Sequence, residues 1–281
     1  MNFNKDNADI FVPDESDANS ALAKTTHLAI VAHQDDTEIL AYHGIAECYG
    51  LKDKWFSSVI VTNGAGSPRS GIYENYTNDE MIDVRRIEQR KAAFVGDFAI
   101  QLQLAYPSSE IKDNDNKNAV DDLEKILKTS QPEVLYLHNP ADKHDTHIAV
   151  LARCIEAIRR LPMEERPQKV YGCEVWRNLD WLDDDEKVFL AVDKYKNLSS
   201  ALIGIFDSQI TGGKRYDLAI QGRRVANATF KQSHAVDQTD MIDFAIDLSP
   251  MIQDDSITLA DFITAHLDQF KSNVLNAVNK Y

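Results

Sequence analysis

The amino-acid sequence predicts an α/β protein with a Rossmann-like, mostly parallel sheet flanked by helices. Short apolar runs of strand character alternate along the chain with longer stretches of helical period. Reactive polar residues cluster directly after several of these runs, where ligands bind in open parallel sheets. The chain of 281 residues is 43% apolar, which is enough for one large domain, and it contains no internal repeat.

Five apolar runs are the expected strands. They cover residues 27–32, 55–62, 97–106, 133–138 and 169–176. Four stretches of helical period would supply the crossovers that parallel strands need, and these cover residues 36–50, 79–96, 118–130 and 145–161. Beyond residue 195 the pattern is mostly helical. We therefore expect a single α/β domain over 1–281, with a core at 25–195 that holds the reactive residues and a mainly helical C-terminal extension at 196–281.

Composition and charge exclude several classes of protein. The formal net charge of −15 disfavours a broad contact surface for a phosphate backbone, so nucleic acid is not an expected partner. The three cysteines are far apart and form no C-x-x-C pair, which fits a reducing compartment. No run approaches the length of a membrane span, and the first 24 residues lack the pattern of a secretory signal. We expect a cytoplasmic protein.

The residues that follow the strands carry the chemistry. His33, Asp35 and Asp36 follow the first strand, and the segment HNPADKHDTH (138–147) follows the fourth with three of the eight histidines. The glycine-containing segment 62–71 follows the second strand and matches neither a dinucleotide fingerprint nor a P-loop. Two imidazoles and a carboxylate from neighbouring strand ends would make an N/N/O donor set suited to zinc, with an open position for water.

Simpler interpretations remain open for each segment taken alone. Asp35-x-x-Glu38 before an apolar run is typical of a helix capping box, and Asp145 could cap the helix that follows it. Capping by Asp35 uses neither His33 nor Asp36. The two segments together therefore favour a metal site more strongly than either one does.

Several motifs in this order resemble the LmbE-like, or PIG-L, zinc-dependent N-deacetylases. AHQDD at 32–36 resembles the A-H-P-D-D signature of that family, and HDTH at 144–147 resembles its H-P-D-H. VRRIEQRKAA at 84–93 is similar to its I-R-x-x-E-x-x-x-A-A helix, VTNGAG to its T-x-G-E-x-G loop, and LIGIFDSQ at 202–209 to a late A-L-x-x-H-x-S-Q element. The resemblance is strongest over about residues 27–150.

The resemblance implies a role for each of six residues. His33, Asp36 and His147 would bind Zn²⁺, and Asp35 would be the base that takes a proton from the metal-bound water. His144 would stabilise the oxyanion or protonate the leaving amine, although a loop histidine without a role is the alternative. Arg85 would bind the substrate away from the scissile amide, unless it pairs with Glu88 or Asp83 on its own helix. Ligands at i and i+3 on one tight turn can face a single ion, which agrees with these assignments.

The implied function is removal of an N-acetyl or other N-acyl group from an amino-sugar type of substrate. The expected partner is a small N-acetylated amino sugar or sugar conjugate, and a homo-oligomer is left open. A metal-binding member without catalysis would fit the ligands but not the presence of Asp35. A nucleotide-binding α/β protein would fit the fold but needs a phosphate loop that this chain lacks.

The sequence also departs from the family pattern. Gln34 stands where the family has proline, Thr37 where it has glutamate, and Ala65 where its loop often has glutamate. Thr146 takes the place of the aspartate in H-P-D-H, and Phe206 falls where the late histidine is expected. None of these changes removes a proposed ligand or the proposed base, but the residues that support the ligands are expected to be rearranged.

Overall fold

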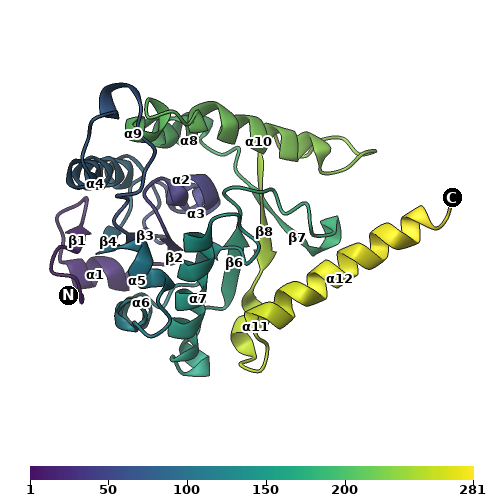
Figure 1. Ribbon diagram of the computed structural model, residues 1–281, viewed down its shortest axis with the longest axis horizontal. Helices are drawn as coiled ribbons and strands as arrows, with labels where there is room; N and C mark the ends of the chain where they lie inside the picture. Colours follow the sequence, from purple (N-terminus) through teal and green to yellow (C-terminus); the bar gives the residue numbers. More distant parts are fainter.

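A single mixed sheet of eight strands forms the middle layer of the molecule. The computed structural model describes residues 1–281 and has the strand order β1-β4-β3-β2-β5-β6-β8-β7 (Figure 1). Neighbours within the central group β4-β3-β2-β5-β6 are all parallel, whereas β1 is antiparallel to β4, β8 to β6 and β7 to β8. The predicted α/β fold with a mostly parallel sheet is confirmed.

The five expected strands are all present within a few residues of their predicted bounds. The strands are β1 (Asp9–Phe11), β2 (His27–Val31), β3 (Phe56–Thr62), β4 (Ile100–Tyr106), β5 (Val134–His138), β6 (Lys169–Cys173), β7 (Lys187–Ala191) and β8 (Ile242–Asp247). Within the sheet, His27 of β2 lies beside Phe56 of β3 and Val134 of β5. These three parallel strands begin in line, so their carboxyl ends reach the same edge of the sheet.

Helices cover both faces of the sheet. The helices are α1 (Ala18–Ala23), α2 (Asp36–Leu40), α3 (Tyr42–Cys48), α4 (Asn78–Val95), α5 (Ser108–Lys112), α6 (Asn118–Ser130), α7 (Asp145–Arg159), α8 (Lys196–Gly204), α9 (Asp207–Ile210), α10 (Tyr216–Phe230), α11 (Ser249–Gln253) and α12 (Leu259–Val278), with short 3₁₀ turns at Gly71–Tyr73, Met163–Glu165 and Asp184–Glu186. In Figure 1, α2, α3, α4 and α8 to α10 lie on one side of the sheet, and α1, α6, α7 and α11 lie on the other.

Two apolar clusters hold these layers together, one on each face of the sheet. Alternate residues of β2 point to opposite sides, since Leu28 and Ile30 join a cluster of 37 buried residues while Ala29 and Val31 join one of 25. Every residue of β2 and β3 is buried. Strands covered on both faces read as continuous apolar runs, which explains why the sequence identified them.

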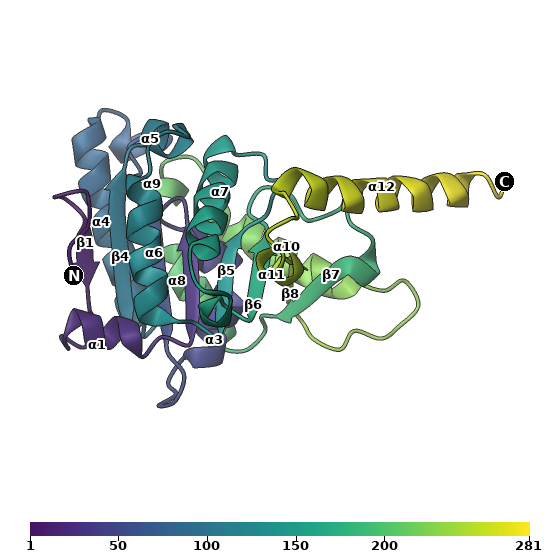
Figure 2. The ribbon, with the colours of Figure 1, turned by 90° about the horizontal axis from the view of Figure 1, so that it is seen from below.

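The structure adds details that the sequence pattern did not indicate. The predicted helix 36–50 is divided into α2 and α3 at Ala41, and β8 forms a strand within the mainly helical region past residue 195. β1 and β7 were also not expected. The last helix, α12, extends away from the body of the molecule (Figures 1 and 2). None of the helices combines the length and apolar character needed to cross a membrane.

The strand order places a crevice between β2 and β5. From β2 the chain moves outward through β3 and β4, and it then returns to form β5 and β6 on the other side of β2. Such a reversal leaves an opening at the carboxyl ends of the two central strands, because the connections leave in opposite directions. The two histidine-bearing segments follow β2 and β5, so both are delivered to this opening.

A buried arginine joins the C-terminal region to the element that carries the site. Arg224 of α10 is fully buried and donates to the carbonyl oxygen of Ile39 at 2.8 Å, at the end of α2. Its Nη1 donates to Ser199 Oγ at 2.7 Å, and its Nε lies 3.0 Å from Asp243 Oδ2 in β8. One guanidinium therefore links α2, α8, α10 and β8.

We expect Arg224→Met to destabilise the fold strongly. The substitution keeps much of the apolar stem but leaves the Asp243 carboxylate and the α2 carbonyls without their donor, and loss of one partner of a buried pair costs about 3–5 kcal/mol. Urea unfolding should show a loss of roughly that size. The matched control is Arg215→Met, whose guanidinium forms an exposed pair with Asp217, and this substitution should change the stability little because exposed ion pairs contribute little. Equal effects of the two variants would contradict the linking role of Arg224.

Candidate active site

The site begins with a tight turn at the carboxyl end of β2. His33 leaves the strand, and its backbone N–H donates to Asp36 Oδ2 at 2.8 Å, so the carboxylate folds back over the turn. Asp36 is the first residue of α2 and is buried. The turn therefore fixes the Asp36 carboxylate beside the His33 ring before any other element contributes.

Three donor atoms from β2 and α7 converge on one point. His33 Nδ1 lies 3.3 Å from Asp36 Oδ2 and 3.2 Å from His147 Nε2, and the remaining pair, His147 Nε2 and Asp36 Oδ2, is separated by 3.4 Å. Ligands around a tetrahedral ion bound at about 2.0–2.1 Å are separated by about 3.3–3.4 Å, as geometry requires. Two ring nitrogens and a carboxylate oxygen at these distances could hold a divalent cation. The three predicted ligands are thus brought together.

Asp142 orients the His147 ring. Its Oδ2 lies 3.1 Å from His147 Nδ1, and both side chains are fully buried. A carboxylate in this position holds the proton on Nδ1 and leaves the Nε2 lone pair free, which is the usual support of a metal-binding histidine. Burial lowers the pKa of His147, but the charges of Asp36 and Asp142 outweigh it and raise that pKa. Asp142 thus takes the supporting role that Thr146 cannot fill.

His138 lies against this cluster but has another partner. Its Nε2 is 3.6 Å from Asp36 Oδ2, and together with Asp36 and His147 it forms a second group of closely spaced donors. However, the backbone N–H of Ala32 donates to the same Nε2 at 2.9 Å. The lone pair that a cation would need is therefore used within the sheet. His138 stacks on His147 at 3.9 Å between ring centroids and supports the site by packing.

Asp35 is held apart from the three donors. Its backbone has φ of 85°, an uncommon conformation for a residue with a side chain, and its carboxylate makes no capping bond to α2. The capping interpretation is therefore not supported by the structure. The Asp35 N–H donates to Gln89 Oε1 at 3.2 Å, and Arg85 Nη2 lies 3.4 Å from Asp35 Oδ1. Burial raises the pKa of Asp35 to about 7, with Arg85 opposing and Asp36 adding to the shift.

Arg85 reaches the site from α4 and does not pair along its own helix. It is buried, with 2% of its surface exposed, and its Nε donates to Gln34 Oε1 at 3.2 Å. Its Nη2 contacts the Gln34 carbonyl oxygen and Asp35. Arg85 Nη1 is buried without a partner. The guanidinium therefore lies beside the Asp35 carboxylate and forms no ion pair with Glu88 or Asp83 of its own helix. Substrate binding by Arg85 away from the scissile amide stays a prediction.

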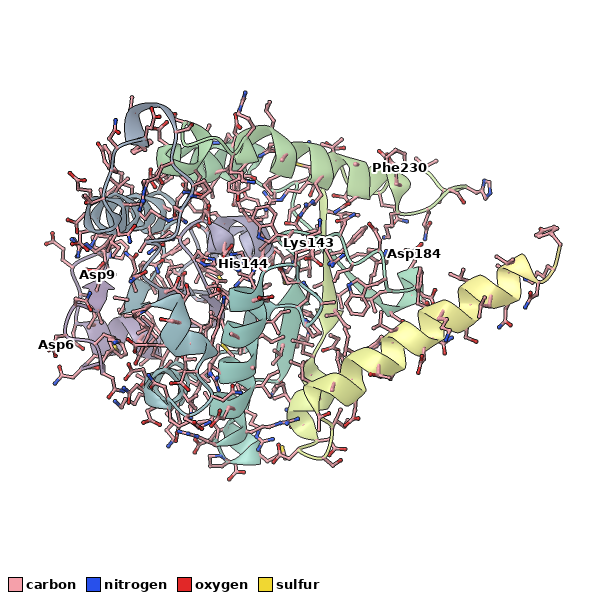
Figure 3. The ribbon with its side chains drawn as sticks, viewed as in Figure 1. Asp6, Asp9, Lys143, His144, Asp184 and Phe230 are labelled. Carbon is pink, nitrogen blue, oxygen red and sulfur yellow. The ribbon has the colours of Figure 1, made fainter.

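His144 is placed at the start of α7, next to the donor triangle. Its ring centroid lies 4.9 Å from that of His33 and 4.7 Å from that of His147. Its Nδ1 accepts from the Thr146 N–H at 3.3 Å, so His144, and not Asp145, caps the helix. With Nδ1 used as an acceptor, the neutral ring carries its proton on Nε2 and can donate it. Figure 3 labels His144 at this helix start.

These residues line a cavity of about 490 Å³ at the crevice between β2 and β5. Its inner wall contains all six residues singled out from the sequence. The rest of the lining, called the outer wall below, comes from the segment after β3, α5, the segment after β6, α9 and the residues around the start of α10. It includes residues that the sequence analysis did not single out: Ser108, Lys112, Trp176, Lys214 and Tyr216. The cavity is large enough for a sugar-sized ligand.

Fold and site together define an α/β protein with a candidate metal centre at the switch point of its sheet. Residues 28–158 match the PIG-L family, described as GlcNAc-PI de-N-acetylase. The matched region is therefore a PIG-L, LmbE-like domain. It contains the three donor residues together with Asp35, Arg85 and His144. None of the curated proteins is similar enough in sequence to count as a match.

Solved structures share the fold at low sequence identity. The 4-carboxy-2-hydroxymuconate hydratase GalB from Pseudomonas putida has 17% identity and a TM-score of 0.61 over 79% of this chain and 95% of its own. The N,N'-diacetylchitobiose deacetylase from Pyrococcus horikoshii has 17% identity and a TM-score of 0.58 over 78% and 83%. The A40926 pseudoaglycone deacetylase Dbv21 has 14% identity and a TM-score of 0.57 over 80% and 97%.

Buried polar side chains of α2 and α4 form hydrogen bonds behind the Asp35 turn. Gln89 of α4 accepts from Asp35 and donates to Glu38 Oε1 at 2.8 Å, while Glu38 Oε2 is buried without a partner. Burial raises the pKa of Glu38 to about 8 from an ordinary value of 4.5. Between these values the folded state binds a proton that the unfolded chain releases. The stability contributed by this group therefore falls as the pH rises from 4.5 to about 8.

We expect Glu38→Gln to flatten this pH dependence. The glutamine keeps the acceptor for Gln89 but cannot ionise, so the metal-free variant should be more stable than the natural protein at about pH 9 and nearly equal to it near pH 4.5. Urea unfolding across this range measures the difference. Glu74→Gln, at an exposed position, is the control and should change stability little at any pH. A constant difference between Glu38→Gln and the natural protein would refute a buried, neutral Glu38.

Proposed function

We propose that this protein is a zinc-dependent hydrolase that removes an N-acetyl or other N-acyl group from an amino-sugar type of substrate. The observation that carries the proposal is the donor triangle of His33, Asp36 and His147. The carboxylate of Asp35 lies beside this triangle but is not one of its three donors. Hydrolysis needs both parts, because a cation site alone would only bind. The PIG-L match over residues 28–158 supports the same reaction.

Each residue of the site has a separate task in this proposal. A bound zinc ion would act as a Lewis acid and lower the pKa of a water molecule. Asp35 accepts the proton of the attacking water, and its buried setting keeps its basicity near neutral pH. It then returns a proton toward the leaving amine. Arg85, which contacts Asp35 Oδ1, keeps the carboxylate facing the cavity.

His144 and Arg85 would act on the substrate. His144 lines the cavity, and its Nε2–H would donate a hydrogen bond to the carbonyl oxygen as negative charge develops on that oxygen. The Arg85 guanidinium, which lines the cavity beside Asp35, would place a second donor near the reacting amide. Both donors are held by bonds to the protein, so little reorganisation is needed when the substrate binds.

The alternative of a hydratase must be tested in the same assay. One protein of similar fold is a 4-carboxy-2-hydroxymuconate hydratase. Addition of water to a carbon–carbon double bond, like amide hydrolysis, is helped by a group that takes a proton from water. Amide hydrolysis is favoured because the family match covers all six residues at the site. Acetate release from N-acetylated amino sugars, compared with hydration of unsaturated acids, separates the two reactions.

Two adjacent aspartates separate metal binding from chemistry. Asp36→Ala should lose both zinc and acetate release, because it removes a corner of the donor triangle. Asp35→Asn should keep zinc, since the amide retains the shape of the carboxylate, but should lower kcat by about 10²–10⁴ with little change in KM. Elemental analysis and kinetics on both variants check this. If Asp35 only capped α2, Asn would replace it without loss, so natural turnover by Asp35→Asn would remove the mechanism.

Asp142 is expected to set the affinity for the metal. Asp142→Asn removes the negative charge behind His147, and loss of such a supporting carboxylate typically weakens metal binding by about 10–100-fold. Competition with a zinc chelator measures the affinity. Asp145→Asn, at an exposed position three residues from Asp142, serves as the control. Equal zinc affinities in both variants would show that Asp142 does not support the site.

A further inference from the structure

The outer wall of the cavity carries positive charge in a protein that is strongly acidic overall. Lys112 of α5 and Lys214, just before α10, both line the cavity, whereas the formal charge of the chain is −15. Neither ammonium forms an ion pair with a carboxylate, although the structure contains many lysine ion pairs elsewhere. These two cations are therefore available to a ligand inside the cavity.

Lys214 is held in place without being neutralised. Its Nζ lies 5.2 Å from the centroid of the Trp176 ring, and Trp176 contacts Tyr216 with 6.1 Å between ring centroids. A carboxylate partner would cancel the charge of a lysine, but an aromatic ring positions an ammonium and leaves its charge intact. Trp176 and Tyr216 line the same cavity. This wall therefore presents aromatic surface and a fixed positive charge together, as recognition of an anionic sugar would require.

The charges at the cavity also favour an anionic ligand. Its lining includes two carboxylates, Asp35 and Asp36, and three cations, Arg85, Lys112 and Lys214. Arg85 faces Asp35 at 3.4 Å and Asp36 faces the histidines, so the inner wall is internally balanced. The two lysines remain as the unbalanced charges, and they lie in a concave site where the surrounding low-dielectric walls strengthen their field.

We infer that the substrate carries an anionic substituent, a carboxylate or a phosphate, which Lys112 and Lys214 bind while the N-acyl group faces the donor triangle. The inference rests on the proposed function, because it assigns the second end of the same substrate. The aromatic pair of Trp176 and Tyr216 packs against the sugar ring between the two ends. The substrate class is thus an acidic N-acyl amino sugar and not a neutral one.

Binding of deacetylated sugars tests the inference independently of turnover. Calorimetry on the zinc-loaded protein compares glucosamine with glucosamine 1-phosphate, glucosamine 6-phosphate and muramic acid, none of which can be deacetylated. At least one anionic sugar should bind about tenfold or more tightly than glucosamine, since hydrogen bonds to charged groups are worth that much. High salt should reduce this preference. The phosphate and carboxylate probes distinguish the two kinds of anion.

Substitution of the two lysines tests whether they cause the preference for sugars that carry an anionic group. Lys112→Gln and Lys214→Gln should each remove most of the tenfold preference, whereas Lys91→Gln, on the exposed side of α4, should leave the preference unchanged. Equal binding of glucosamine and of the sugars with an added phosphate or carboxylate, failure of all the latter to bind, or a preference that survives both lysine variants would overturn the inference.

The outcome for the proposed function is read separately, from acetate release by the N-acetylated forms of the same sugars. Lysine-dependent binding without any acetate release would leave the anionic subsite standing and refute the hydrolase. Acetate release at equal efficiency from neutral and anionic N-acetylated sugars would support the hydrolase and refute the anionic subsite.

Discussion

The buried carboxylate of Asp36 is the constraint on which the rest of the site depends. A carboxylate removed from water needs compensating donors or cations. Here the backbone N–H of His33 donates to Oδ2 at 2.8 Å, and the imidazoles of His33, His147 and His138 lie 3.3, 3.4 and 3.6 Å from the same atom. These histidines hold the pKa of Asp36 far below its usual range, although burial opposes this. The carboxylate stays charged where a cation could sit.

The groups that compensate the buried charge of Asp36 come from segments that are distant in sequence. β2 and β5 start in register and end at the same edge, so the turn after β2 meets the segment before α7. Arg224 then fixes the end of α2 from the opposite side, through the carbonyl of Ile39. Gln89 supports the uncommon backbone of Asp35 from α4. The geometry of a few side chains thus depends on the packing of three helices against one sheet.

The sequence predicted those parts of the structure that depend on local pattern. Buried parallel strands are continuous apolar runs, and the residues directly after them lie at the edge where ligands bind, so His33, Asp36 and the histidines of 138–147 could be singled out. The resemblance to the PIG-L family then selected His147 among those histidines. β8 was missed because Asp243 and Asp247 interrupt its apolar pattern, and Asp243 is compensated only by Arg224 from another element. Asp142 was missed because its contact with His147 Nδ1 depends on how the segment before α7 folds. Lys112 and Lys214 were missed because the sequence pattern does not show which residues line the cavity. The only sequence signal for the role of Asp142 was a carboxylate five residues before His147.

The central claim is that three side chains hold one metal ion and leave Asp35 free. A crystal structure of the zinc-loaded protein, with anomalous scattering recorded at the zinc edge, tests it most directly. The account predicts one peak per chain at about 2.0–2.1 Å from His33 Nδ1, Asp36 Oδ2 and His147 Nε2, and beyond bonding distance of Asp35 and His138. A peak bonded to Asp35 or His138, or a fully zinc-loaded protein without a peak inside the triangle, would contradict the account.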